Sequence, residues 1–374
     1  MSALMRLSSR LQAVNCRFRV QILLADKIFF PMHIGPYALA HPVLLAPMAG
    51  VTDQPFRQLC RGFGAAYAVS EMVSARADLR GTRESARRAA CLDEPGPLAV
   101  QIVGADPALM AEAAREHIGR GARIIDINMG CPSRKVCHRW AGSALMRDEA
   151  LALSIIEAVV AACAPHGVPV TLKMRTGSSS ADRNAARLAR AAESAGVQMI
   201  AVHGRTREQG YRGPAEYQTI AEVKAAVRVP VAANGDIDSP AKAQAVLAAS
   251  GADAVMIGRA AWGRPWIFRE VAHFLATGRH LAPPLTLEVR RALLAQLHAH
   301  YRLYGQAAGV RSARKHIGWC VRGLPGGAAL RERVNTLEQA AAQARAVAGY
   351  FSDLAQAHER LPAAAAPREE MKPA

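Results

Sequence analysis

The run IIDINMGCPSRKV, from Ile124 to Val136, contains the residues whose types and spacing point most directly to chemistry. An apolar stretch ends at Asn128, a Met-Gly turn follows, and the turn presents Cys131. An isolated free cysteine is more often a small buried hydrophobic residue than a reactive group. The sequence beyond this cysteine favours a reactive thiol beside an anionic substrate, because three basic residues follow it: Arg134, Lys135 and Arg139.

Composition limits the classes of protein that this chain can belong to. With 374 residues, of which 51% are hydrophobic, it can form one large domain and a smaller one. No apolar run reaches the roughly 20 residues of a membrane helix, so no membrane association is expected. The seven cysteines include no C-x-x-C pair, which predicts a cytoplasmic protein without disulfides or a metal site. A net charge of +17 favours a polyanionic partner such as a nucleic acid.

The elements that must position these residues follow a regular alternation. Helices are expected between short apolar strands, for example over Gln54–Gly62, Pro107–Gly119 and Ala181–Ser194. Continuous apolar strands alternating with helices indicate parallel strands covered on both faces. Eight such units predict an α/β fold, a (β/α)8 TIM barrel. The predicted strands are Val43–Ala46, Ala66–Ser70, Leu98–Ile102, Arg123–Ile127, Val170–Met174, Met199–His203, Val231–Ala233 and Ala254–Ile257.

The segments that flank the barrel differ from it in pattern. Residues 1–31 are predicted to be a disordered or mis-started extension, with Met32 as the natural start. The barrel is expected over residues 32–283. Residues 284–356 have helical spacing and more basic than acidic residues, which predicts a helical domain. Residues 357–374 are rich in Ala, Pro and charge, as in a disordered tail.

Polar residues and glycines at the ends of the predicted strands are candidates for the active site, because barrel enzymes build it there. The last two strands end in glycines and an arginine, a combination that suits phosphate. Lys173 could be a Schiff-base lysine or a cation facing an anionic ring, and His203 a structural residue or a ligand contact. The strand-end candidates are Pro47, Met48, Ala49, Gln101, Asn128, Cys131, Lys173, Arg175, His203, Asn234, Gly235, Asp236, Gly258 and Arg259.

These residues together favour flavin mononucleotide (FMN) as a cofactor. The Gln101 amide can donate to and accept from the edge of a heterocycle. The small apolar residues after the first strand can pack against one face of a flat ring. A nicotinamide-only site fits less well, because the first strand lacks the glycine-rich dinucleotide turn. A pyridoxal phosphate site would leave Gln101 and Cys131 without a role.

From about Met32 to Phe351 the sequence resembles the tRNA-dihydrouridine synthase family, most closely its B-type bacterial branch. The shared motifs include APMAGVTDQPFR, IDINMGCPSRKV, AGSALM, VTLKMRTG, VHGRTREQGY, ANGDI and ADAVMIGRAAWGRPWIF. One departure is Cys137-His138-Arg139-Trp140, in a loop that flanks the expected pocket, where the family often has Asn-Arg-Lys-Leu.

The resemblance implies a role for most of these residues. Pro47, Met48 and Ala49 would line the flavin, Gln101 would bond its ring, and Lys173 would lie near its electron-rich edge. Cys131 would be the proton donor. The resemblance also implies that Asn234, Gly235, Asp236, Gly258 and Arg259 hold the phosphate side, that Asn128 and His203 belong to the pocket, and that Arg314, Lys315 and His316 contact tRNA.

The predicted reaction is reduction of the uridine C5–C6 bond in the tRNA D-loop, with NADPH or NADH as reductant and a monomeric enzyme. Arg134, Lys135 and Arg175 are expected to contact the substrate. One alternative is an FMN barrel acting on a free pyrimidine, as a dihydroorotate or dihydropyrimidine dehydrogenase does. Two others are a flavin-free RNA-binding protein on an inactive barrel and a Schiff-base aldolase that uses Lys173.

Overall fold

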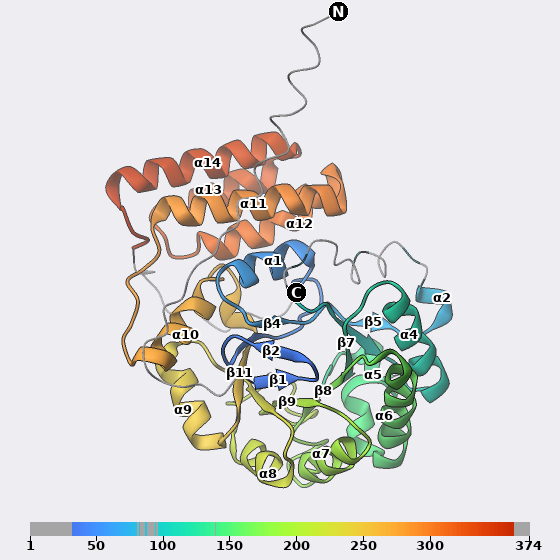
Figure 1. Ribbon diagram of the computed structural model, residues 1–374. Coiled ribbons are helices and arrows are strands. Elements are labelled where there is room, and N and C mark those ends of the chain that lie inside the picture. The colour runs from blue at the N-terminus through green and yellow to red at the C-terminus, as the bar shows by residue number, and fades with distance from the viewer. Residues whose placement is uncertain are drawn as a thin grey trace, which may run out of the picture.

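The structure is a computed structural model that describes residues 32–80, 82, 87, 94, 96–138 and 140–362. The predicted extension over residues 1–31 lies outside the described part, as does the chain beyond residue 362. A barrel of strands is surrounded by helices, and a stack of further helices lies at one side of it (Figure 1). The predicted TIM barrel with a C-terminal helical region is therefore confirmed.

One parallel sheet forms the barrel, in the strand order β4-β3-β11-β10-β9-β8-β7-β6-β5. All eight predicted strands are present, and their ends differ from prediction by at most two residues. The strands are β3 (Val43–Leu45), β4 (Tyr67–Ala68), β5 (Val73–Ser74), β6 (Ala99–Val103), β7 (Ile124–Met129), β8 (Val170–Arg175), β9 (Met199–His203), β10 (Val231–Asn234) and β11 (Ala254–Ile257).

The sheet closes because β4 and β5 are two halves of one strand position. β4 pairs with β3, and β5 pairs with β6 on the other side. Between the two halves, Val69 forms a parallel bridge with Ala99, and the Ser70 amide donates to the Ala99 carbonyl at 3.0 Å. β11 pairs with β3, which completes the ring. Eight strand positions result, and the interruption at Ser70–Met72 was not predicted.

Alternating side chains explain why these strands close into a packed barrel. Along β3, Leu44 joins the cluster inside the barrel, while Val43 and Leu45 join the larger cluster under the helices. Every residue of β3 and β6 is buried, as expected for parallel strands covered on both faces. The barrel interior is thus filled with side chains, which leaves its strand ends as the place for a site.

An antiparallel hairpin precedes the barrel and was not predicted. It consists of β1 (Met32–Ile34) and β2 (Tyr37–Leu39), joined through Gly35 with φ +56°. Its Ile34 and Leu39 are buried in the interior cluster. In Figure 1 the hairpin lies across the end of the barrel. It therefore closes the end opposite the predicted active site.

Seven helices form most of the outer layer in the described part of the chain. Several start at a capping side chain: Asp53, Asp106, Asp148 and Ser239 each accept from a backbone amide of the first turn. The seven are α1 (Gln54–Gly62), α4 (Pro107–Gly119), α6 (Glu149–Cys163), α7 (Ala185–Ser194), α8 (Gln218–Ala226), α9 (Pro240–Ser250) and α10 (Ile267–Thr277).

Helix α7 begins four residues later than predicted. Ser178 and Asp182 bond each other twice, from the Ser178 amide to the Asp182 carbonyl at 3.1 Å and from Ser178 Oγ to Asp182 Oδ2 at 2.8 Å. These bonds hold a turn over the residues where the helix was expected to start.

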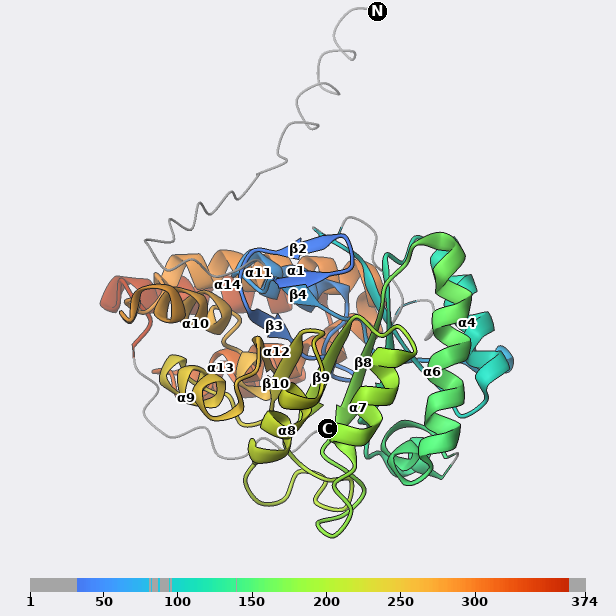
Figure 2. The same ribbon diagram turned by 60° about the horizontal axis from the view of Figure 1, so that its bottom comes forward.

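One stretch of the described chain, Glu149–His166, is long and apolar enough to cross a membrane by length and composition. It contains α6, whose Ile155, Ile156 and Val159 are fully buried. Figures 1 and 2 show α6 beside α4 on the outside of the barrel. Its apolar character is therefore that of a helix buried on one face.

The C-terminal region folds into four helices around a core of its own, which includes Leu293, Ile317, Val347 and Phe351. Phe63 and Trp266, from the barrel part of the chain, also belong to this core. The glycine- and proline-rich run Gly323–Gly327 leads from the second of these helices to the third. They are α11 (Thr286–Tyr304), α12 (Gln306–Cys320), α13 (Gly327–Thr336) and α14 (Ala340–Ala357).

Candidate functional site

Cys131 lies in the loop directly after β7, and a chain of buried polar side chains fixes this loop. Asn128 Oδ1 accepts a hydrogen bond from the Cys131 amide at 2.9 Å. Asn128 Nδ2 donates to Gln101 Oε1 at 2.7 Å, and Gln101 Nε2 donates to Asp126 Oδ2 at 2.6 Å. Thr171 Oγ1 donates to the other oxygen of Asp126 at 2.6 Å. Side chains from three neighbouring strands, β6, β7 and β8, thus hold the backbone that carries the thiol.

The carbonyl of Cys131 is held as firmly as its amide. It accepts from Ser143 Oγ at 2.9 Å and from the Ser143 amide at 3.0 Å. Burial raises the pKa of the half-buried Cys131 thiol, and the nearby Arg175 and Lys173 lower it by less. The thiol therefore stays protonated near neutral pH, as a proton donor must.

Lys173 and His203 lie at the same end of the barrel but differ in charge at neutral pH. Lys173 Nζ donates to Asn234 Oδ1 at 3.2 Å. Burial, reinforced by Arg175 and opposed by Asp126, lowers the pKa of Lys173 to about 8. Burial also moves the pKa of His203 well below its usual value, and nearby cations act in the same direction. His203 is therefore a neutral imidazole beside a group that is mostly cationic at neutral pH.

Asp236 organises the predicted phosphate loops. Its carboxylate accepts from Arg205 Nη2 at 2.9 and 2.7 Å, from Arg259 Nη2 at 3.2 Å and from the Ala215 amide at 2.8 Å. A carboxylate bonded in this way holds two arginines in place and would repel a phosphate at the same point. Asp236 therefore holds Arg205 and Arg259 in position at this end of the barrel.

Glycine is required at position 235 by both backbone and space. Gly235 has φ +128°, and an added Cβ would lie 2.7 Å from the Cβ of Ala215 and 3.2 Å from Cδ2 of His203. At Gly258 an added Cβ would meet only Met48 Sδ at 3.6 Å and Ala46 Cβ at 3.8 Å, which is ordinary contact. Of the two glycines predicted in the phosphate loops, Gly235 is therefore required by its backbone and by the space around it, whereas the space around Gly258 would accept a Cβ.

Arg175 was predicted to contact substrate, and its bonds point to a positioning role. Its Nε donates to the Gly130 carbonyl at 2.7 Å, and its Nη1 donates to the carbonyls of Thr206 and Gly210 at 2.9 and 2.8 Å. The side chain is 1% exposed. It therefore ties the Cys131 loop to the loop after β9.

The loop after β3 contains the predicted flavin-lining residues Pro47, Met48 and Ala49. Pro47 and Met48 are half-buried, while Ala49 is exposed. Met48 Sδ accepts from Trp262 Nε1 at 3.2 Å. The loops after the first and last barrel strands therefore touch each other.

The residues predicted to bind tRNA lie in two separate places, one beside Cys131 and one in the helical region. Arg134 and Lys135 are in the short helix α5 (Arg134–Cys137), just beyond Cys131. Arg314 donates to the Leu337 carbonyl at 3.0 Å, within the helical region. Lys315 is half-buried and donates to the carbonyl of Gly50. His316 is only 4% exposed, so its side chain offers almost no surface for contact with RNA.

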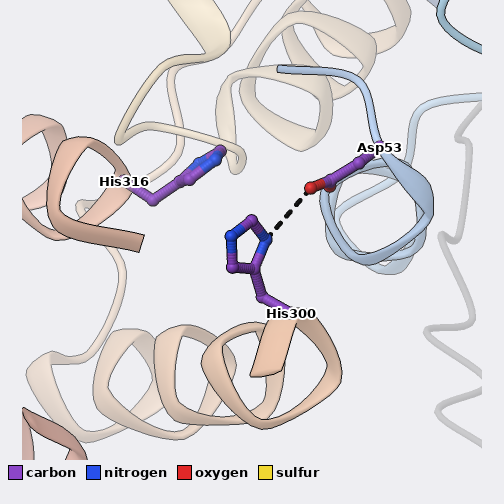
Figure 3. Close-up of side chains that lie close together, drawn as sticks. All are labelled: Asp53, His300 and His316. Atoms are coloured by element: carbon purple, nitrogen blue, oxygen red, sulfur yellow. Dashed lines mark ion pairs between the residues drawn. The ribbon is translucent and has the colours of Figure 1, made fainter. Parts of the chain in front are cut away.

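His316 belongs instead to a buried cluster with Asp53 and His300, drawn in Figure 3. The three ligand-type atoms lie within 4.8 Å of one another, and the closest contact is the Asp53 Oδ2–His300 Nδ1 ion pair at 3.0 Å. His300 Nε2 lies 2.7 Å from Ser312 Oγ, and His316 Nδ1 lies 3.2 Å from Gln296 Nε2. The cluster joins the start of α1 to α11 and α12.

Sequence reasoning missed several residues that shape the site. Asp126, a carboxyl inside a buried strand, was the clearest available signal, because such a group needs partners. Burial raises the pKa of Asp126 to about 6. No comparable signal marked the others, whose importance comes from contacts between distant segments. The others are Ser143, Thr171, Asp53 and His300.

Comparison with known proteins agrees with this geometry. The family model described as dihydrouridine synthase matches residues 44–357. The chain is 56% identical over 323 residues to tRNA-dihydrouridine synthase B of Xanthomonas axonopodis, covering 86% of this chain and 96% of the relative. It is 53% identical to the protein of that name from Pseudomonas putida over 328 residues, covering 88% and 96%.

Among solved structures, histamine dehydrogenase from Rhizobium sp. 4-9 superposes with a TM-score of 0.52 at 12% identity. The match covers 90% of this chain and 65% of that chain, and it supports the fold alone. The family model spans most of the barrel and the helical region, and the relatives are more than half identical. The chain therefore belongs to the dihydrouridine synthase family of enzymes.

Proposed function

We propose that this enzyme reduces the C5–C6 double bond of uridine in the D-loop of tRNA, with FMN as cofactor and NADPH or NADH as reductant. The observation that carries the proposal is the placement of Cys131 directly after a barrel strand, where hydrogen bonds hold its backbone on both sides and burial raises the pKa of its thiol. We place the enzyme in the cytoplasm as a monomer.

The residues at the strand ends fit an anionic cofactor with a heterocyclic ring. Lys173, Arg175, Arg205 and Arg259 gather at the same end of the barrel, where Asp236 already neutralises part of their charge. The ammonium of Lys173 has three protons and donates one to Asn234, so it can serve a further acceptor. Gln101 likewise keeps a second amide proton after bonding Asp126.

When bound, FMN would supply the hydride chemistry between the nicotinamide and C6 of the uracil ring. Cys131 would donate its proton to C5 of the same ring, and the raised pKa of the thiol keeps that proton available. The Lys173 ammonium would stabilise negative charge on the bound cofactor. The uridine must leave its stack in the tRNA to reach Cys131, which favours a loop position.

Replacement of Cys131 by Ala tests the proton-donor role separately from cofactor binding and cofactor reduction. The variant should keep cofactor binding and its reduction by NADPH, because neither uses the thiol. Dihydrouridine formation should fall by about 10²–10⁴-fold, the usual contribution of a positioned acid. Mass spectrometry of tRNA nucleosides after reaction measures the product. The matched control is Cys137→Ala, a half-buried thiol in the same loop; wild-type product formation by Cys131→Ala would refute the proton-donor role.

A further inference from the structure

Helix α12 contacts the loop that follows the first barrel strand. Lys315 Nζ donates to the carbonyl of Gly50, which has φ +72°. On the other side of the same residue, the Gly50 amide donates to Oε1 of Glu71, a carboxylate from the interrupted second strand position. Gly50 is thus held between a cation from the helical region and an anion from the barrel.

The same helix contacts the loop that follows the last barrel strand. The indole of Trp319 stacks on Trp262, with ring centroids 4.6 Å apart and planes inclined by 16°. The Trp319 carbonyl lies so near Gly263 that an added Cβ would be 2.2 Å from it. Trp262 also donates to Met48 Sδ at 3.2 Å. Trp319 therefore reaches both loops, one directly and one through Trp262.

The Asp53 cluster fixes the position of α12 relative to these loops (Figure 3). Asp53 Oδ1 caps α1 by accepting from the Phe56 amide at 3.0 Å, and Asp53 Oδ2 pairs with His300 of α11. The rings of His316 and Phe56 lie 5.7 Å apart between centroids, and those of His316 and Trp319 lie 5.1 Å apart. All three cluster members are buried, so the side chains that join α1 to α11 and α12 are shielded from solvent.

We propose that α12 sets the geometry of both cofactor loops, with Lys315 and Trp319 as positioning residues for bound FMN. Lys315 thereby serves the flavin site and not the tRNA surface. This inference rests on the proposed function, because the two loops are those assigned to the flavin ring and phosphate. It gives the helical region a second task besides contact with RNA.

The test uses the full chain with its flavin removed and added back. Lys315→Met keeps the aliphatic stem and removes the ammonium. FMN affinity, measured by quenching of flavin fluorescence without tRNA, should weaken by about tenfold or more, as expected for loss of a charged hydrogen bond. The affinity for tRNA, measured separately, should stay within about twofold of wild type.

The matched control is Arg311→Met, an exposed cation one turn earlier on α12, which should leave FMN affinity unchanged. Trp319→Phe provides a second variant, and it should also weaken FMN binding. Far-ultraviolet circular dichroism and thermal unfolding verify that each variant folds. Wild-type FMN affinity in both Lys315→Met and Trp319→Phe would overturn the inference, as would weaker tRNA binding by Lys315→Met with unchanged FMN affinity.

These results are distinguishable from failure of the proposed function. A wild-type chain that binds no FMN under these conditions would overturn both proposals together. A wild-type chain that binds FMN with the same affinity as both Lys315→Met and Trp319→Phe would overturn only the role of α12, and the assignment of FMN and Cys131 would stand.

Discussion

At the scale of single residues, burial sets the charge of the two groups on which the proposed chemistry depends. It raises the pKa of the Cys131 thiol, so the proton donor keeps its proton. It lowers the pKa of Lys173, so the cation near the cofactor is easily lost. Burial therefore favours the proton-donor role of Cys131 and limits the pH range in which Lys173 is a cation.

The lowered pKa of Lys173 predicts pH-dependent cofactor binding. Without cofactor, Lys173 titrates near pH 8, and a bound anion favours its charged form and so raises its pKa. FMN affinity should be full below pH 8 and fall by up to about tenfold per pH unit as pH rises above it. Titrations of the flavin-free protein across this range measure the effect, and Lys173→Met should remove most of the slope. An equally steep slope in that variant would contradict the assignment.

At the scale of elements, the loop after β10 depends on a glycine that no other residue can replace without strain. Gly235→Ala should destabilise the protein by about 1–3 kcal/mol more than Gly251→Ala. Gly251 also has a positive φ, +62°, but an added Cβ there meets nothing within 4 Å. Denaturant unfolding of both variants measures the difference. Equal destabilisation would mean that the contacts with Ala215 and His203 relax at little cost.

The sequence predicted elements better than the contacts between them. The β7 apolar run followed by Met-Gly located Cys131, because strand ends and tight turns have local signals. The β1–β2 hairpin was missed because its short strands are partly exposed and lack the continuous buried apolar run that marks β3. The bond between Lys315 and Gly50 joins residues 265 apart in sequence, so no local pattern could reveal it.

At the scale of the whole molecule, the net charge of +17 predicts binding that depends on salt. Affinity for tRNA should fall about a hundredfold between about 50 and 200 mM salt, the loss for roughly four neutralised phosphates. Filter binding across this range measures the slope. A protein that reduced free uracil and bound tRNA only weakly, without salt dependence, would instead be a free-pyrimidine dehydrogenase.

The contact of α12 with both cofactor loops also has a consequence for biosynthesis. The ribosome completes the whole barrel before it reaches Lys315 and Trp319, so an emerging chain has every strand but lacks the helix that fixes these loops. On the proposed role of α12, the flavin is captured firmly only after this helix has been made. A product that terminates before α12 would then be a pale barrel that releases its flavin, even though every strand that presents the site has been made.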